Sequence, residues 1–166
     1  PYLQGSNSPN YEANARGSIV GMTFGHSRCD IVRSLMEGIC FEGKDMLEAM
    51  IDGNVPSYDV IRLSGGIARS QFWCQMQADI YNLPCETVAE EEATALGCAM
   101  MAAYGAGIYK SFQEAADHMV HVTRRYEPNA ENVKRYEDAY HTWHEIYHAL
   151  SGKGFDAVKD FQEKYR

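Results

Sequence analysis

The sequence lacks several features that would assign it to a function class at once. It has no run of about 20 consecutive apolar residues, as a membrane-spanning helix requires, and no basic segment followed by an apolar one that would direct export. Acidic residues outnumber basic ones, 23 to 15, for a formal net charge of −8. Because like charge repels phosphates, this balance argues against a nucleic-acid or anionic-membrane surface.

Motifs built on cysteine, glycine or serine are also missing. The five cysteines are odd in number and form no C-x-x-C pair. Such cysteines are typical of reduced, small apolar core residues in a cytosolic protein, so we expect a cytoplasmic location. The dinucleotide motif G-x-G-x-x-G, the Walker A loop and the hydrolase elbow G-x-S-x-G are all absent.

The beginning of the chain lacks a methionine. Residues 1–17 (PYLQGSNSPNYEANARG) are rich in Gly, Ser, Asn and Pro, a composition typical of a loop inside a protein. We therefore expect the chain to be an excised fragment. Its 166 residues, 45% hydrophobic and 23% charged, are typical of one compact globular domain.

Strand and helix patterns alternate in the first half of the chain. β-forming residues between glycines predict a strand over residues 17–24. Ser27 can cap a helix with Asp30 in its first turn. We expect this helix to run for about 25 residues, with an apolar stripe formed by Ile31, Leu35, Ile39, Met46 and Met50. Gly38 and Gly43 inside it predict close approach of another element, and Gly53, Pro56 and Ser57 end it.

Further strands are predicted over residues 58–63 and 85–88, and further helices over 70–82 and 93–104. This alternating order is typical of an α/β layered sheet. From residue 111 onward the patterns are helical. Ser111 and Glu114 form a capping box, Asn129 caps a longer helix, and an amphipathic tail follows over 155–165.

The helix after Asn129 carries aromatic residues on one face: Tyr136, Tyr140, Trp143 and Tyr147, followed by Leu150. We expect this face to pack against the domain or against a partner subunit, rather than to bind a ligand by stacking.

The glycine pair Gly65-Gly66 lies between a predicted strand and a predicted helix, where open α/β sheets bind their ligands. Without Cβ atoms, the backbone there can adopt a positive φ and approach a nucleotide closely. A plain strand-to-helix turn can also require glycine, so the residues alone leave both interpretations open.

The sequence evidence for a metal site is weaker than that for a ligand loop at the glycine pair. Two histidine groups have the spacing that puts ligands on one helix face: His118 with His121, and His141, His144 and His148. No cysteine or carboxylate pattern completes a zinc set. The acidic run 90–92 is explained by the dipole of the helix that follows it.

Residues 64–79 (SGGIARSQFWCQMQAD), followed by NLP at 82–84 and EATALGCA at 92–99, closely resemble the carboxyl-terminal half of the FGGY carbohydrate kinases, particularly xylulokinase-like members. That family's pattern is G-G-G-A-[RK]-S-x-x-W-x-Q-x-x-A-D, then G-x-P-V, then E-x-x-A-L-G-A-A. Residues 16–38 resemble its second signature region, and Pro1–Gly5 its P-Y-L-x-G loop. The resemblance covers about residues 1–109.

The resemblance implies an α/β fold: part of an actin-like, ribonuclease-H-like ATPase domain, with carboxyl-terminal helices. Residues 1–110 are expected to belong to the nucleotide-binding domain, and residues 111–166 to form a helical extension packed on it. The implied reaction is transfer of the γ-phosphoryl group of ATP to a sugar hydroxyl, with a pentulose such as xylulose as the expected sugar. We expect the fragment alone to be inactive.

By position, the resemblance implies that Gly65, Gly66 and Ser70 touch the adenosine and α-phosphate side of ATP, with Ile67 and Ala68 as the wall. Ile67 stands where the family usually has a third glycine, so we expect a stiffer turn. The family's catalytic aspartate and its sugar site lie upstream, so no catalytic residue and no metal ligand are assigned. Mg²⁺ is expected to be held through ATP and the amino-terminal part.

A second hypothesis is a non-catalytic module with a kinase-like fold, which serves in dimerisation or regulation through the aromatic helix over residues 129–150. A homodimer is compatible with both hypotheses. Neither includes a nucleic acid or a membrane as partner.

Overall fold

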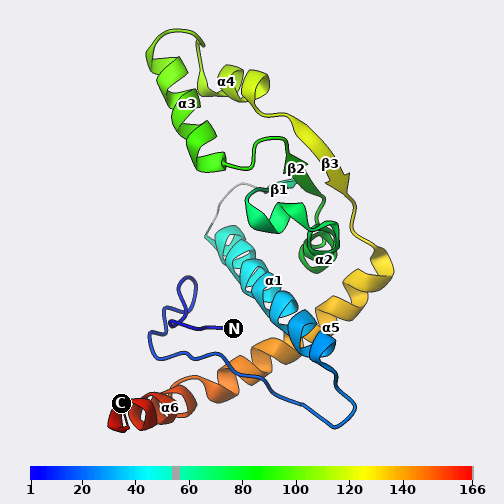
Figure 1. Cartoon of the computed structure of the whole chain (residues 1–166), viewed down its shortest axis with the longest axis vertical. Coiled ribbons are helices and arrows are strands. Elements are labelled where there is room, and N and C mark those ends of the chain that lie inside the picture. The colour runs from blue at the N-terminus through cyan, green and yellow to red at the C-terminus, as the bar shows by residue number, and fades with distance from the viewer. Residues whose placement is uncertain (54–56, 166) are drawn as a thin grey trace. The chain divides into compact units, whose positions relative to one another are not determined.

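The computed structural model describes residues 1–53 and 57–165 and divides into two compact units. Unit 1 comprises Pro1–Ser57 and Lys134–Arg166, and unit 2 comprises Tyr58–Val133. The elements (Figure 1) are α1 (Arg28–Asp52), β1 (Ile61–Leu63), the 3₁₀ helix η1 (Gly66–Arg69), α2 (Gln71–Tyr81), β2 (Cys85–Val88), α3 (Ala93–Gly105), α4 (Phe112–Met119), β3 (Val122–Tyr126), α5 (Ala130–Leu150) and α6 (Lys153–Lys164). Helix α5 begins in unit 2 and continues into unit 1.

Unit 2 contains a three-stranded sheet in the order β1-β2-β3. Strands β1 and β2 are parallel, with Leu63 opposite Thr87, and β2 and β3 are antiparallel, with Cys85 opposite Tyr126. The sequence patterns missed β3, because only Tyr126 of its five residues is buried and no apolar alternation marks it. The chain after residue 110 therefore contributes a strand as well as helices.

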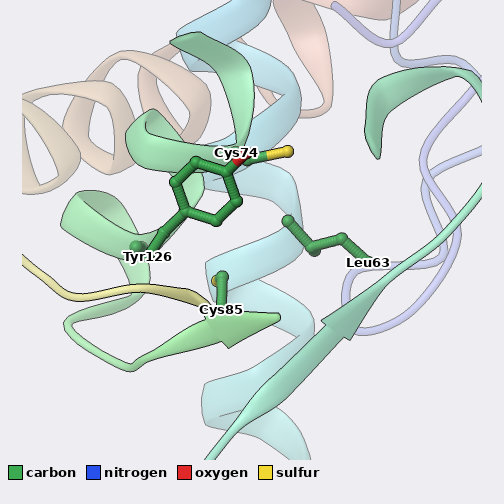
Figure 2. Packing of buried hydrophobic residues seen from close by; sticks show 5 residues of the cluster. Leu63, Cys74, Cys85 and Tyr126 are labelled. Carbon is green, nitrogen blue, oxygen red and sulfur yellow. The ribbon is translucent and has the colours of Figure 1, made fainter. Parts of the chain in front are cut away.

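The core of unit 2 joins α2 to all three strands. Figure 2 shows Leu63 of β1, Cys74 of α2, Cys85 of β2 and Tyr126 of β3 facing one another. Ala78, Cys74 and Cys85 are fully buried, so small side chains allow the helix to lie close to the strands. The expectation of reduced core cysteines is confirmed for Cys40, Cys74 and Cys85, but Cys29 and Cys98 are exposed.

A buried carboxylate fixes α2 to the beginning of α5. Asp79 is only 3% exposed. Its Oδ1 accepts hydrogen bonds from the Asn129 backbone N–H (2.8 Å) and the Gln75 side chain (2.9 Å). Its Oδ2 accepts one from the Asn132 side chain (2.8 Å). The negative charge thus lies at a helix N-terminus, where unpaired N–H groups and the helix dipole favour it.

The predicted helix caps are largely confirmed. The Ser27 hydroxyl accepts from the Asp30 N–H, and the Asp30 carboxylate accepts in return from the Ser27 N–H, as in a capping box. Asn129 accepts from two N–H groups at the start of α5. Ser111 caps α4, but Glu114 bonds to the Lys110 N–H rather than to that of Ser111.

Helix α1 has the predicted length, and Gly53 is its C-cap; Pro56, expected to help end it, lies outside the described residues. Gly38 is buried, and a Cβ there would lie 3.0 Å from Pro1 Cδ, which confirms the close approach predicted at Gly38.

The face of α1 that packs on α5 is polar and aromatic rather than the predicted apolar stripe. Phe41 packs against three aromatic rings of α5, those of Tyr136, Tyr140 and Trp143, at centroid distances of 5.9–6.3 Å. Buried Asp45 accepts from Tyr140 (3.2 Å) and lies 2.6 Å from His144 Nε2. The aromatic face of α5 therefore packs within unit 1.

The apolar stripe of α1 is exposed instead. The side chains of Leu35, Ile39, Met46 and Met50 are all more than 40% exposed. The strand predicted over residues 17–24 is also wrong: this segment is irregular, and Phe24 is fully exposed. A strand needs a neighbour to satisfy its backbone groups, and no described residue pairs with this segment.

Glu12 contributes three of the hydrogen bonds that fix the N-terminal loop to the junction of α5 and α6. Glu12 accepts hydrogen bonds from the Tyr147 hydroxyl (2.8 Å), the Ser151 hydroxyl (2.9 Å) and the Gly152 N–H (2.7 Å). Tyr2, Ala15, Tyr147 and Phe155 form the small core beside it. Among the described residues, no helix is long and apolar enough to cross a membrane.

We predict that Asp79→Ala lowers the free energy of unfolding by about 2–3 kcal/mol, because it leaves buried donors at the start of α5 without an acceptor. Urea denaturation of the chain measures this. Asp138→Ala, which removes an exposed carboxylate from α5, is the control and should change stability by less than about 0.5 kcal/mol. Equal effects of the two substitutions would contradict the role of Asp79.

Candidate nucleotide-binding loop

The glycine pair forms the connection between β1 and α2, as the sequence predicts. Gly65 has φ 74° and ψ −160°, and Gly66 opens η1. Two backbone hydrogen bonds close the turn: Ala68 N–H to Gly65 C=O and Ser70 N–H to Ile67 C=O, each 3.1 Å. The loop is therefore a defined turn at the carboxyl end of β1, the edge at which open α/β sheets bind ligands.

The five predicted site residues are adjacent in this turn but differ in exposure. Gly66 is exposed, whereas Gly65, Ile67, Ala68 and Ser70 are half-buried. Ala68 packs against the core of unit 2, and the Ser70 hydroxyl oxygen accepts from the Trp73 N–H (3.3 Å) as the N-cap of α2. Because Ser70 accepts in this bond, its O–H remains able to donate to a ligand.

The backbone conformation requires glycine at one of the two positions and not at the other. Gly65 lies in the positive-φ region, which side chains with a Cβ rarely adopt. Gly66 does not, and apart from the adjoining backbone no described atom lies within 4 Å of a Cβ built at either position. Neither backbone conformation nor crowding within the described residues thus requires glycine at position 66.

Ile67 lies inside η1 and has no positive φ, so its backbone conformation does not need the glycine that the family usually has there. Its carbonyl accepts from the Ser70 N–H and lies 3.8 Å from Cys74 Sγ. A helical, hydrogen-bonded residue at this position is consistent with the stiffer turn that we expect.

A second loop lies beside the first. Residues 89–92 follow the carboxyl end of β2, the parallel neighbour of β1. Arg69 Nε lies 3.2 Å from both carboxylate oxygens of Glu91, and Arg69 Nη2 donates to Glu91 Oε2 as well. The Arg69 guanidinium holds the pKa of the Glu91 carboxyl below its usual range.

Sequence reasoning missed this ion pair. It interpreted residues 90–92 as complementing the dipole of α3, yet the first turn of α3 contains no acidic residue and the Glu92 side chain makes no capping hydrogen bond. The only signal was an arginine in the glycine motif followed, 22 residues later, by an acidic run.

Members of both candidate histidine groups contact other side chains or backbone atoms in the described residues. His118 Nδ1 contacts the Glu114 carbonyl oxygen (2.8 Å), and His144 contacts Asp45 and Tyr140. Within residues 1–53 and 57–165, no group of three or more metal-ligating side chains comes together.

Comparison with known proteins gives the family. A family model for the carboxyl-terminal domain of the FGGY family of carbohydrate kinases matches residues 1–106. The xylulose kinase of Bacillus subtilis is 34% identical over 147 residues, which are 89% of this chain and 29% of that protein. A glycerol kinase of Janthinobacterium is 36% identical over 87% of this chain and 28% of its own length.

Solved structures agree with the sequence relatives. A ligand-bound xylulose kinase from Lactobacillus acidophilus matches with a TM-score of 0.84 and 31% identity, covering 92% of this chain and 31% of that one. A gluconate kinase from the same organism matches with a TM-score of 0.83 and 31% identity, over the same shares.

The chain thus has the fold of the sugar kinases, an actin-like ATPase fold present in part. It belongs to the FGGY family of carbohydrate kinases and corresponds to the carboxyl-terminal domain. It spans about 30% of the length of the relatives that it matches.

We predict that Gly65→Ala destabilises the chain by about 1–2 kcal/mol, since a Cβ is strained at positive φ. Gly66→Ala should cost less than about 0.5 kcal/mol, because the Cβ points into open space. Chemical denaturation of the two variants compares them. The opposite order would show that the conformation of the turn differs from the one described.

Proposed function

We propose that this chain is the nucleotide-binding part of an ATP-dependent kinase that transfers the γ-phosphoryl group of ATP to a hydroxyl of a sugar. The observation that carries the proposal is Gly66. It is exposed at the carboxyl end of β1, has no positive φ and has no neighbour that would exclude a side chain. A glycine that neither conformation nor packing requires is explained by a ligand that lies against the bare backbone.

Each residue of the loop has its own role in binding the nucleotide. Gly65 turns the chain, Gly66 lets the adenosine and α-phosphate side of ATP approach the backbone, and the Ser70 hydroxyl donates a hydrogen bond. Ile67 and Ala68 supply an apolar wall. ATP, when bound, supplies the phosphoryl group, and Mg²⁺ is held through ATP and the remainder of the kinase. Phosphoryl transfer depends on positioning and electrostatic stabilisation, which a loop fixed between a strand and a helix favours.

The exposed surfaces of unit 1 support the assignment to a longer kinase. Six large apolar side chains of α1 and the β-forming segment 17–24 are exposed to solvent. Exposed apolar side chains in such number are normally covered by other protein. The catalytic aspartate and the sugar site belong to that remainder, so the chain alone is inactive.

We expect loss of ATP binding when Gly66 is replaced by valine in the full-length kinase that contains this chain, because the side chain fills the space assigned to the nucleotide. Calorimetric titration with ATP measures the effect, and a more than tenfold rise in Kd is expected. Gly105→Val is the control: that glycine is also exposed, has open space and lacks a positive φ. Unchanged ATP affinity in Gly66→Val would overturn the proposed site.

The sugar is proposed from the relatives. Xylulose kinases from Bacillus subtilis and Staphylococcus epidermidis match at 34% and 35% identity, and glycerol kinases match at similar levels. We propose a pentulose such as xylulose. A panel of sugars and polyols offered to the full-length kinase in a coupled ADP-release assay should give the highest kcat/KM with xylulose, whereas a preference for glycerol or gluconate would contradict this substrate and leave the kinase assignment intact.

A further inference from the structure

The ion pair between Arg69 and Glu91 connects two loops at the same edge of the sheet. Arg69 is the last residue of η1 and directly precedes Ser70, the N-cap of α2. Glu91 lies in the loop that leads from β2 into α3. Because β1 and β2 are parallel neighbours, their carboxyl ends meet at one edge, and the ion pair spans the two loops that leave it.

The geometry of the pair is specific. Arg69 Nε and Nη2 both face the Glu91 carboxylate, with Nε 3.2 Å from each oxygen. A planar guanidinium that meets a carboxylate through two nitrogens fixes orientation as well as distance, which a lysine in the same place could not do.

The partner loop is itself anchored. The Ala89 N–H donates to the His121 carbonyl (2.8 Å) immediately before β3, and the Leu96 N–H donates to the Glu92 carbonyl (3.0 Å) at the start of α3. Glu91 is thus carried by a short segment that is fixed at both ends. Through Glu91, Arg69 is therefore bonded to a fixed segment outside its own turn.

The pair contributes little to stability, since the two side chains are 71% and 50% exposed and exposed ion pairs are weak. An ion pair that is weak for stability can still bias the orientation of the exposed residues of the loop, in addition to the turn's own hydrogen bonds and the packing of Ala68. A loop ordered before the ligand arrives lowers the entropy cost of binding.

We propose that Arg69 and Glu91 are positioning residues that hold the glycine loop in the conformation that receives the nucleotide. The inference rests on the proposed function, since the loop must bind a nucleotide for its orientation to matter. Neither side chain is assigned a contact with the reacting atoms. Glu91 orients the glycine loop although it lies outside the glycine motif.

The test uses the full-length kinase and steady-state kinetics with ATP as the varied substrate. Glu91→Gln removes the charge but keeps the shape, and we expect KM for ATP to rise about two- to fivefold, the range of an exposed ion pair, with kcat and Tm unchanged. Arg69→Glu alone should also raise KM for ATP. The double exchange Arg69→Glu with Glu91→Arg should bring KM for ATP most of the way back to the wild-type value. The difference between wild type and Glu91→Gln should shrink in 1 M salt.

Glu127→Gln is the matched control, because Glu127 forms an exposed ion pair with Arg125 on β3; it should leave KM for ATP unchanged. An unchanged KM in Glu91→Gln would overturn the inference, as would parallel losses of kcat and Tm or a failed rescue by the exchange. Failure of the proposed function is distinguishable: ATP would then bind as tightly to Gly66→Val as to the wild type, whatever the behaviour of Glu91.

Discussion

The buried carboxylate of Asp79 is the contact on which the geometry of unit 2 depends. It fixes α2 to the start of α5 by two hydrogen bonds, from the Asn129 N–H and the Asn132 side chain, and accepts a third from Gln75 of α2 itself. The opposite end of α2 begins at Ser70, inside the glycine loop. The small, fully buried side chains of Cys74 and Ala78 then bring the same helix close to the strands. The loop is therefore held from both sides: by β1 before it and by an anchored helix after it.

Most elements of unit 2 could be predicted because their signals are local. Ser70 and Asn129 bond to N–H groups two or three residues away, and such caps can be recognised within a short window of sequence. The position of the glycine pair at the end of a strand was predictable for the same reason. The exposed state of Gly66 was not, because exposure depends on which distant residues surround it.

The features that the sequence did not reveal all depend on distant partners. Strand β3 exists because β2 offers it an edge, and Arg69 pairs with a residue 22 positions away. The stripe on α1 was identified from its spacing, but spacing cannot say which face meets α5. That face contains Phe41, Lys44 and Asp45, whose hydrogen bonds, ion pair and ring contacts are made with α5. Residues 17–24 include β-forming side chains, but no described residue pairs with them to make a strand.

The uncovered stripe of α1 has a consequence for biosynthesis. A carboxyl-terminal domain is the last part of its polypeptide to leave the ribosome, and domains generally fold as they emerge. If residues that precede α1 in a longer polypeptide cover it, they are present before the helix is made, and its apolar side chains are exposed only briefly. The same chain expressed by itself would keep that surface in water throughout its life, which favours aggregation and turnover by cellular proteases.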